Sequence, residues 1–167
     1  MALPNLVTLL QTGCLAILAV LLIAAAWQDL RTLHIENGLS IAIAALFAAW
    51  AVFGLASGTF PLSAIGVSIA CATGLFAAGA AAFAAGMMGG GDVKLLAAVA
   101  LFAGPAQILD LLLVTAVAGG LLGIALLAGA PVGPVSGPGE AALRRRLPYG
   151  PAIAVGGLWV ATRLVVG

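Results

Sequence analysis

Residues 6–27, LVTLLQTGCLAILAVLLIAAAW, form an apolar run without a single charged side chain. A helix needs ~20 such residues to cross the hydrocarbon core of a bilayer. The run is continuous and does not alternate, which favours a helix over a strand. Similar runs fill most of the chain, which is 64% hydrophobic and only 7% charged. The sequence therefore predicts an all-α, polytopic transmembrane bundle.

Outward from this first run, the sequence predicts about six spans. The expected spans are residues 6–27, 38–55, 62–86, 93–103, 108–129 and 148–166, with a polar connection at 28–37 and turns at 57–61 and 104–107. Pro105 supports the second turn, because proline removes a backbone donor and disfavours helix in the residue before it. Only an even number of crossings between Lys94 and Arg144-Arg145-Arg146 keeps these cations on one side, as the positive-inside rule requires. Six crossings put both termini on the extracytoplasmic side.

The whole chain, residues 1–167, is interpreted as one integral-membrane domain. Residues 130–147 are rich in glycine and proline, and we expect them to form a cytoplasmic loop whose arginines contact anionic headgroups. Arg163 would lie on the other side, near enough to a helix end to snorkel. The net charge of +1 argues against a nucleic-acid partner. Cys14 and Cys71 lie in apolar runs and predict neither a disulfide framework nor a CxxC site.

Two acidic residues, Asp29 and Asp92, lie at the ends of expected spans on the cytoplasmic side. A charged side chain at membrane depth is costly, so each indicates a functional site. Two carboxylates can hydrolyse a peptide bond when one is ionised and activates water while the other is protonated and hydrogen-bonds the scissile carbonyl. Like charges held close together favour that division. The pair would titrate as one unit, so the sequence does not assign the proton to either member.

A structural interpretation competes with the catalytic one. Each acid could be a boundary residue in headgroup water, with Asp29 paired to Arg31 and Asp92 paired to Lys94. The three glycines at 89–91, directly before Asp92, favour catalysis. They leave the backbone free to bend and to let an extended substrate strand approach closely.

The other polar residues are weaker candidates for this site. Asp110 would lie on the far side of the membrane, since residues 92–104 make ~18 Å of helix. Glu36 and Glu140 are expected to be solvated on the cytoplasmic side. His34 has no partner ligand in the sequence, so no metal site is predicted.

Three stretches resemble motifs of one family, the type IV prepilin peptidases. GGGDVK at 89–94 resembles its GxGDxK signature, and DLRTLHIEN at 29–37 resembles its first aspartate motif. LPYGP at 147–151 is similar to the segment that opens a late helix in these enzymes. The small size, without an N-terminal cysteine-bearing loop, resembles the short branch that serves Flp-type, tight-adherence pili.

The resemblance implies an aspartic endopeptidase of the bacterial inner membrane. Such an enzyme removes the basic leader of a prepilin at the cytoplasmic face, after a glycine and before the pilin's apolar helix, with no metal or cofactor. The resemblance implies that Asp29 and Asp92 are catalytic. It also implies a set of residues that shape the loop or contact substrate: Gly89, Gly90, Gly91, Lys94, Asn37 and Tyr149. The implied partners are the prepilin and membrane lipid.

The chain departs from the family pattern in two ways. Glu36 stands where many members have proline, and it adds a negative charge near Asp29. Nothing corresponds to the cytoplasmic domain with paired cysteines that larger relatives use for methylation, so we expect cleavage without methyl transfer.

Two other functions stay open at this point. The chain could be a small transporter or channel whose buried aspartates bind a cation or relay protons, which would require polar groups at successive depths. It could also be a non-enzymatic assembly subunit in which the glycine motif serves helix packing. The sequence identifies neither the pilin nor the oligomeric state.

Overall fold

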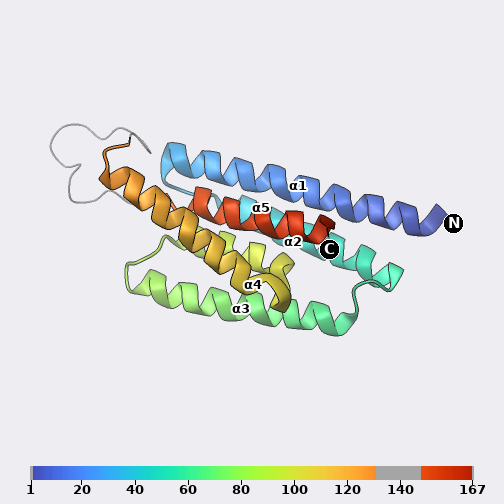
Figure 1. Cartoon of the computed structure of the whole chain (residues 1–167). Helices are drawn as coiled ribbons and strands as arrows, with labels where there is room; N and C mark the ends of the chain where they lie inside the picture. Colours follow the sequence, from blue (N-terminus) through green and yellow to red (C-terminus); the bar gives the residue numbers. More distant parts are fainter. Residues whose placement is uncertain (1, 131–147, 167) are drawn as a thin grey trace.

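The computed structural model of the chain describes residues 2–130 and 148–166, which form a bundle of five helices (Figure 1). The helices are α1 (Ala2–Thr32), α2 (Asn37–Ser57), α3 (Leu62–Ala84), α4 (Gly90–Leu127) and α5 (Gly150–Val166). Four of those described, α1 to α4, are long and apolar enough to cross a membrane by length and composition, and α5 is a shorter apolar helix. The predicted all-α class of a multi-pass membrane protein is confirmed.

The helix α4 reverses its direction at Gly104, which has φ 52° and ψ −165° (Figure 1). These angles are reached almost exclusively by glycine, and Pro105 then starts the returning arm. Residues 90–103 form a first arm and residues 105–127 a second arm. The break predicted at 104–107 is confirmed, although the second arm begins at Pro105 and not at residue 108.

The helix α1 is longer than the sequence suggested. It continues to Thr32, so the predicted connection at 28–37 is wrong over its first half. Side chains in this last turn have partners that let the helix continue: Thr32 Oγ1 donates to the Gln28 carbonyl at 2.9 Å, and the Arg31 guanidinium lies 4.3 Å from the centre of the Trp27 ring. Asp29 therefore lies inside a helix.

The other boundaries agree with the prediction to within a few residues. The turn after α2 is closed by Gly58, which has φ 74° and donates its N–H to the Leu55 carbonyl at 3.1 Å. The helix α3 ends at Ala84, two residues before the predicted end, and α4 begins at Gly90, three before the predicted start. All but the first residue of the cytoplasmic loop expected at 130–147 lies outside the described residues, and with it Glu140 and the arginine cluster.

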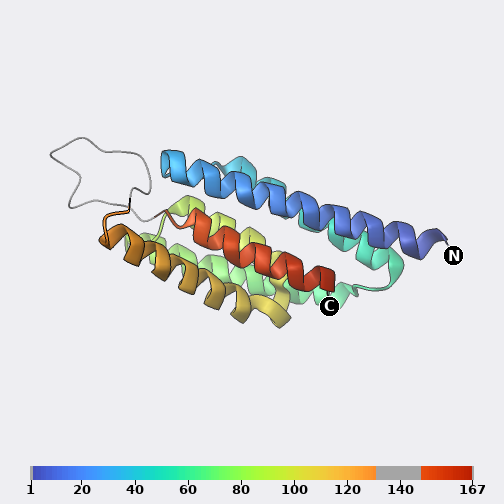
Figure 2. The same cartoon turned by 45° about the horizontal axis from the view of Figure 1, so that its top comes forward.

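Small residues bring the helices close together in the core. Figure 2 shows α5 between α1 and the second arm of α4. A Cβ on Gly157 of α5 would come within 2.7 Å of Leu22 Cδ1 on α1, and one on Gly119 of α4 would lie 3.6 Å from Ala152 of α5. Lipid offers little hydrophobic drive for helix association, so such close packing is a main source of stability. It also fixes where the helix ends lie.

Candidate active site

The end of α1 and the starts of α2, α4 and α5 lie at the same end of the bundle (Figure 1). Asp29 on α1 and Asp92 on α4 are only 4% and 9% exposed there, and they are the two buried charged side chains in the described part of the chain. Buried carboxylates cost free energy unless they are hydrogen-bonded, paired or protonated. The partners of these two acids therefore decide what the site can do.

Asp29 is held by the start of α5. Its Oδ2 accepts a hydrogen bond from the backbone N–H of Gly150 at 2.7 Å. Gly150 is the first residue of α5, where N–H groups lack partners within the helix and the helix dipole favours a negative charge. A Cβ at this position would come within 2.6 Å of Asp29 Cβ, so a side chain at position 150 would displace the carboxylate.

Asp92 lies in the first turn of α4 and turns back to the start of its own helix. Its Oδ2 lies against Gly89 and interacts with the Gly89 backbone N–H, as an acidic side chain does in a capping box. Its Oδ1 is buried and has no hydrogen-bond partner among the described residues. The charge of Asp29 acts on Asp92, so these acids lie within electrostatic reach of one another.

The glycines before Asp92 have an internal packing role that the sequence did not reveal. A Cβ on Gly89 would meet Asp92 Oδ2 at 2.6 Å, and one on Gly91 would meet the Ile35 carbonyl oxygen at 3.0 Å. A Cβ on Gly90 would only touch Phe83, at 3.4 Å. The sequence interpretation assigned all three glycines to bending and substrate approach. The structure adds a different reason at 89 and 91, namely room for the carboxylate and for the neighbouring chain.

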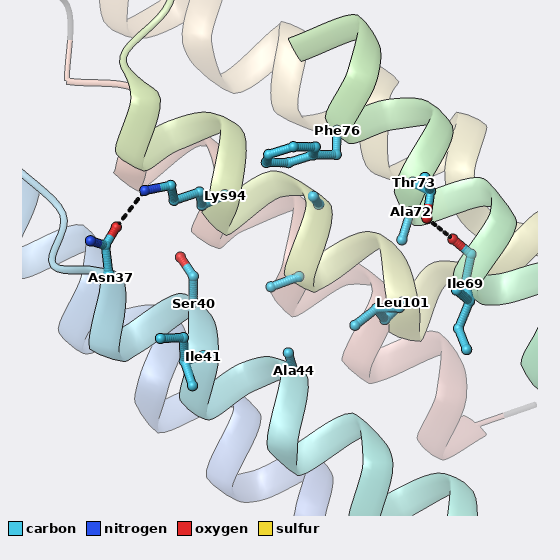
Figure 3. A pocket seen from close by; sticks show the side chains of 12 residues that line it. Asn37, Ser40, Ile41, Ala44, Ile69, Ala72, Thr73, Phe76, Lys94 and Leu101 are labelled. Carbon is cyan, nitrogen blue, oxygen red and sulfur yellow. Dashed lines mark hydrogen bonds between the residues drawn. The ribbon is translucent and has the colours of Figure 1, made fainter. Parts of the chain in front are cut away.

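The basic residues near the site have partners other than the aspartates. Lys94 Nζ donates to Asn37 Oδ1 at 2.8 Å (Figure 3), and Arg31 lies over the Trp27 ring. Within residues 2–130 and 148–166, Asp29 is bonded to Gly150 instead of Arg31, and Asp92 faces Gly89 instead of Lys94. The competing interpretation, in which each acid pairs with the nearby cation, is not what this part of the chain forms.

The remaining candidates lie outside this cluster. Asp110 is exposed on the second arm of α4, just after the reversal at Gly104, and so is far from the start of the first arm. Glu36 and His34 are exposed in the connection after α1. Tyr149 is half-buried and packs against Gly119, on the second arm of α4. The described residues contain no group of three or more His, Cys, Asp or Glu side chains suited to a metal ion.

Sequence reasoning missed two polar groups at this end of the bundle. Gly150 belongs to the LPYGP stretch, but the residue singled out there was Tyr149, and only the fold reveals the bond to Asp29. Ser40 on α2 is 7% exposed with an Oγ that lacks a partner among the described residues. A lone serine in an apolar span gives no signal of its own. It lines a cavity of about 560 Å³ that also reaches Lys94 (Figure 3).

The sequence matches the model of a known protein family. A model of the Type IV leader peptidase family matches residues 16–124, a segment that includes Asp29, Asp92 and the glycines between α3 and α4. No curated protein and no solved structure matches the chain. The family match covers more than half of the sequence and both buried acids. The chain therefore belongs to the type IV leader peptidase family.

Proposed function

We propose that this leader peptidase is an aspartic endopeptidase that cleaves prepilins with Asp29 and Asp92 at the cytoplasmic face of the bacterial inner membrane. The observation that carries the proposal is the convergence of these acids: they come from α1 and α4, are both buried at the same end of the bundle, and the charge of Asp29 reaches Asp92. Helix packing alone gives no reason to bury two interacting carboxylates, because each would cost free energy there. A shared catalytic proton gives such a reason.

The partners of the two carboxylates support different roles for them. Asp29 accepts a short backbone hydrogen bond from the start of α5, which stabilises a negative charge. Asp92 Oδ1 is buried without a partner, which suits an oxygen that carries a proton and awaits a substrate acceptor. Asp29 is therefore the base in our proposal, and Asp92 is the acid.

The reaction then needs only water and these side chains. Asp29 takes a proton from the water, whose oxygen attacks the scissile carbonyl carbon, while Asp92 gives its proton to the carbonyl oxygen. The resulting diol collapses: Asp92 takes a proton back from a hydroxyl, the carbon–nitrogen bond breaks, and the proton on Asp29 passes to the departing amine. Both aspartates end in their starting states. No group for methyl transfer enters this scheme, so the new amine is expected to stay unmethylated.

The proposed topology has six crossings, made by α1, α2, α3, the two arms of α4, and α5. The reversal at Gly104 supports this count, because it lets α4 cross twice. With Lys94 and Arg31 on the cytoplasmic side, as the positive-inside rule favours, both aspartates lie at the inner face and both termini lie outside. A conduction path would need further acids in line with the pair. Asp110, the acid that could extend such a path, is exposed instead.

The proposal is tested by incubating the purified protein in vesicles with a Flp-type prepilin and measuring the masses of the products. We expect a single cut after a glycine and an unmethylated new N-terminus. Asp29→Asn and Asp92→Asn should each lower the rate by ~10³-fold or more, as loss of one member does in other catalytic groups that act as a unit. Asp110 is an exposed acid on the same helix as Asp92, so Asp110→Asn serves as the control. This variant should cleave prepilin at the normal rate. Normal trimming by either active-site variant would contradict the proposal.

A further inference from the structure

A groove runs between α2 and α3, over the first arm of α4. Its polar end is the cavity of about 560 Å³ that contains Lys94, and a second cavity of about 370 Å³ continues it toward the other end of α2. The two cavities share Ala44, Ile69 and Leu101, so they form one path. The helices α2 and α3 each pack against α4 and hardly against each other. Figure 3 shows the polar end of this groove, with side chains from all three helices facing it.

The groove is nearly as long as the hydrocarbon core of a bilayer is thick. Its lining on α2 runs from Asn37 to Leu55, which is about 27 Å at 1.5 Å per residue. The hydrocarbon core of a bilayer measures ~30 Å, whereas one lipid chain reaches only half of that depth. The rim of the groove is open to its surroundings, since Ile41 is 67% exposed and Ile69 is 49% exposed. A transmembrane helix fits this length, and it can reach the groove sideways from the membrane.

The lining of the groove includes several small side chains beside larger apolar ones such as Phe47 and Leu101. The small ones are Ala44, Ala48 and Ala51 on α2, and Ala97 and Ala98 on α4. Small residues let the backbone of another helix approach closely, and this contact is a main source of helix association in lipid. The apolar lining therefore suits the face of an apolar helix.

The polar end of the groove gathers hydrogen-bond donors. Ser40 is 7% exposed, lines the cavity, and has no partner for its Oγ in the described residues. Lys94 donates one of its three ammonium N–H groups to Asn37 Oδ1. Its other two N–H groups and the amide N–H groups of Asn37 can donate to a substrate. Lys94 and Asn37 lie at the starts of α4 and α2, so these donors are at the same end of the bundle as the proposed catalytic pair. An extended peptide offers unpaired backbone carbonyls that such donors can bind.

We propose that this groove holds the apolar transmembrane helix of the leader-bearing substrate, and that Ser40, Asn37 and Lys94 bind backbone carbonyls of the extended segment next to the cut. The inference rests on the proposed function, since it places the substrate of that same reaction. The substrate's transmembrane helix would then lie against α2 and α3 and against no other face of the bundle.

Photo-cross-linking tests the occupant directly. A photoreactive residue is placed at Ile69, on the rim of the groove, and in a matched protein at Val155 on α5, which is equally 49% exposed but lies outside the groove. Both proteins are mixed with full-length prepilin in vesicles and illuminated. We expect a prepilin adduct at Ile69 and none at Val155. Equal adducts at both positions, an adduct to lipid alone, or an adduct between two copies of the protein would each overturn the proposal.

Steady-state kinetics test the two parts of the groove separately. Ala48→Phe places a large side chain in the groove and should raise KM for full-length prepilin by about 10-fold, while a short peptide that ends before the apolar helix is cleaved as by the wild type. Ala45→Phe, at an exposed position on the same helix but outside the groove, should change KM for neither substrate. Ser40→Ala removes one neutral hydrogen bond, so KM should rise about 2- to 10-fold with kcat unchanged. Unchanged KM values in Ala48→Phe would overturn the proposal.

The outcomes separate the groove from the catalytic pair. Cleavage by the wild type without an Ile69 adduct would overturn the groove and leave the proposed function standing. An adduct at Ile69 would support the groove even if the Asp29→Asn variant cleaved prepilin at the normal rate. Normal cleavage by that variant would contradict only the two-aspartate mechanism.

Discussion

At the residue scale, the position of the two carboxylates depends on the space left by three glycines. Gly150 lies against Asp29, Gly89 lies against Asp92, and Gly91 lies against the backbone of Ile35. None of the three has a positive φ, so the requirement is for space and not for an unusual backbone. The smallest side chain added at any of them must push a neighbour aside.

The stretch at 89–91 contains its own control. Gly89→Ala would bring a Cβ within 2.6 Å of Asp92 Oδ2, and Gly91→Ala one within 3.0 Å of the Ile35 carbonyl oxygen. We expect kcat for prepilin cleavage to fall by ~10²-fold in both, the cost of a small misplacement of a catalytic group. Gly90→Ala makes only an ordinary contact with Phe83 and should keep most of the activity. A greater loss in Gly90→Ala than in its neighbours would contradict this packing argument.

Gly150→Ala tests the support that α5 gives to Asp29. The added Cβ would displace the carboxylate, so kcat should fall sharply, while circular dichroism should show unchanged helix content because alanine favours helix over glycine. Gly38→Ala at the start of α2, where a Cβ meets nothing within 4 Å, is the matched variant and should remain active. Full activity in Gly150→Ala would mean that the bond to Asp29 is dispensable.

Sequence analysis found the acids at this scale but not their partners. Asp29 and Asp92 stand out because a charge in an apolar chain is rare and costly. Gly150 and Ser40 gave no comparable signal, since one is a backbone donor and the other a single hydroxyl. Their roles depend on which helices pack together, and this packing cannot be read from the sequence alone.

At the scale of elements, the reversal of α4 is the feature on which the topology depends. Gly104 combines φ 52° with ψ −165°, and a Cβ there would also lie 2.9 Å from Ser68 Oγ on α3. Both the backbone and the space favour glycine. The two arms of α4 keep their directions only while this residue keeps its conformation.

Gly104→Ala should therefore lower the stability of the bundle by about 1–3 kcal/mol, the usual cost of a strained backbone conformation. Thermal unfolding in detergent measures the effect as a lower Tm. Gly120→Ala on the second arm of the same helix, with nothing within 4 Å of the added Cβ, should leave Tm unchanged or raise it. An unchanged Tm in Gly104→Ala would show that the turn tolerates a side chain.

Element boundaries were predicted well where local chemistry sets them and less well where packing does. The Gly-Pro pair at 104–105 and the turn around Gly58 are local signals, and both breaks are found there. The extension of α1 to Thr32 was missed, because hydropathy ends a span at the first polar residue. Asp29 lies in this extension, and its carboxylate accepts a hydrogen bond from the start of α5.

At the scale of the whole molecule, the bundle joins the proposed catalytic end to the groove between α2 and α3. The fold class and the family were both predictable, since apolar runs and three ordered motifs are visible in the sequence. The groove was not, because it results from α2 and α3 packing on α4 while leaving each other almost untouched.

The proposed six crossings are tested by labelling single cysteines in a variant whose Cys14 and Cys71 are replaced by alanine. Ala106→Cys, just after the reversal, and Leu127→Cys, at the end of the second arm, are both at exposed positions. A membrane-impermeant thiol reagent applied from outside should label Ala106→Cys in intact cells and Leu127→Cys only after permeabilisation. Labelling of both from the same side would mean that the second arm does not cross the membrane.

The central claim, that Asp29 and Asp92 act as one catalytic unit, is tested most directly by comparing single-turnover cleavage rates of Asp29→Asn, Asp92→Asn and the double variant on the same prepilin. Residues that act as a unit are strongly non-additive. The double variant is therefore expected to be no slower than the slower single variant. Losses that multiply in the double variant would contradict the claim, because they would show two acids that work independently.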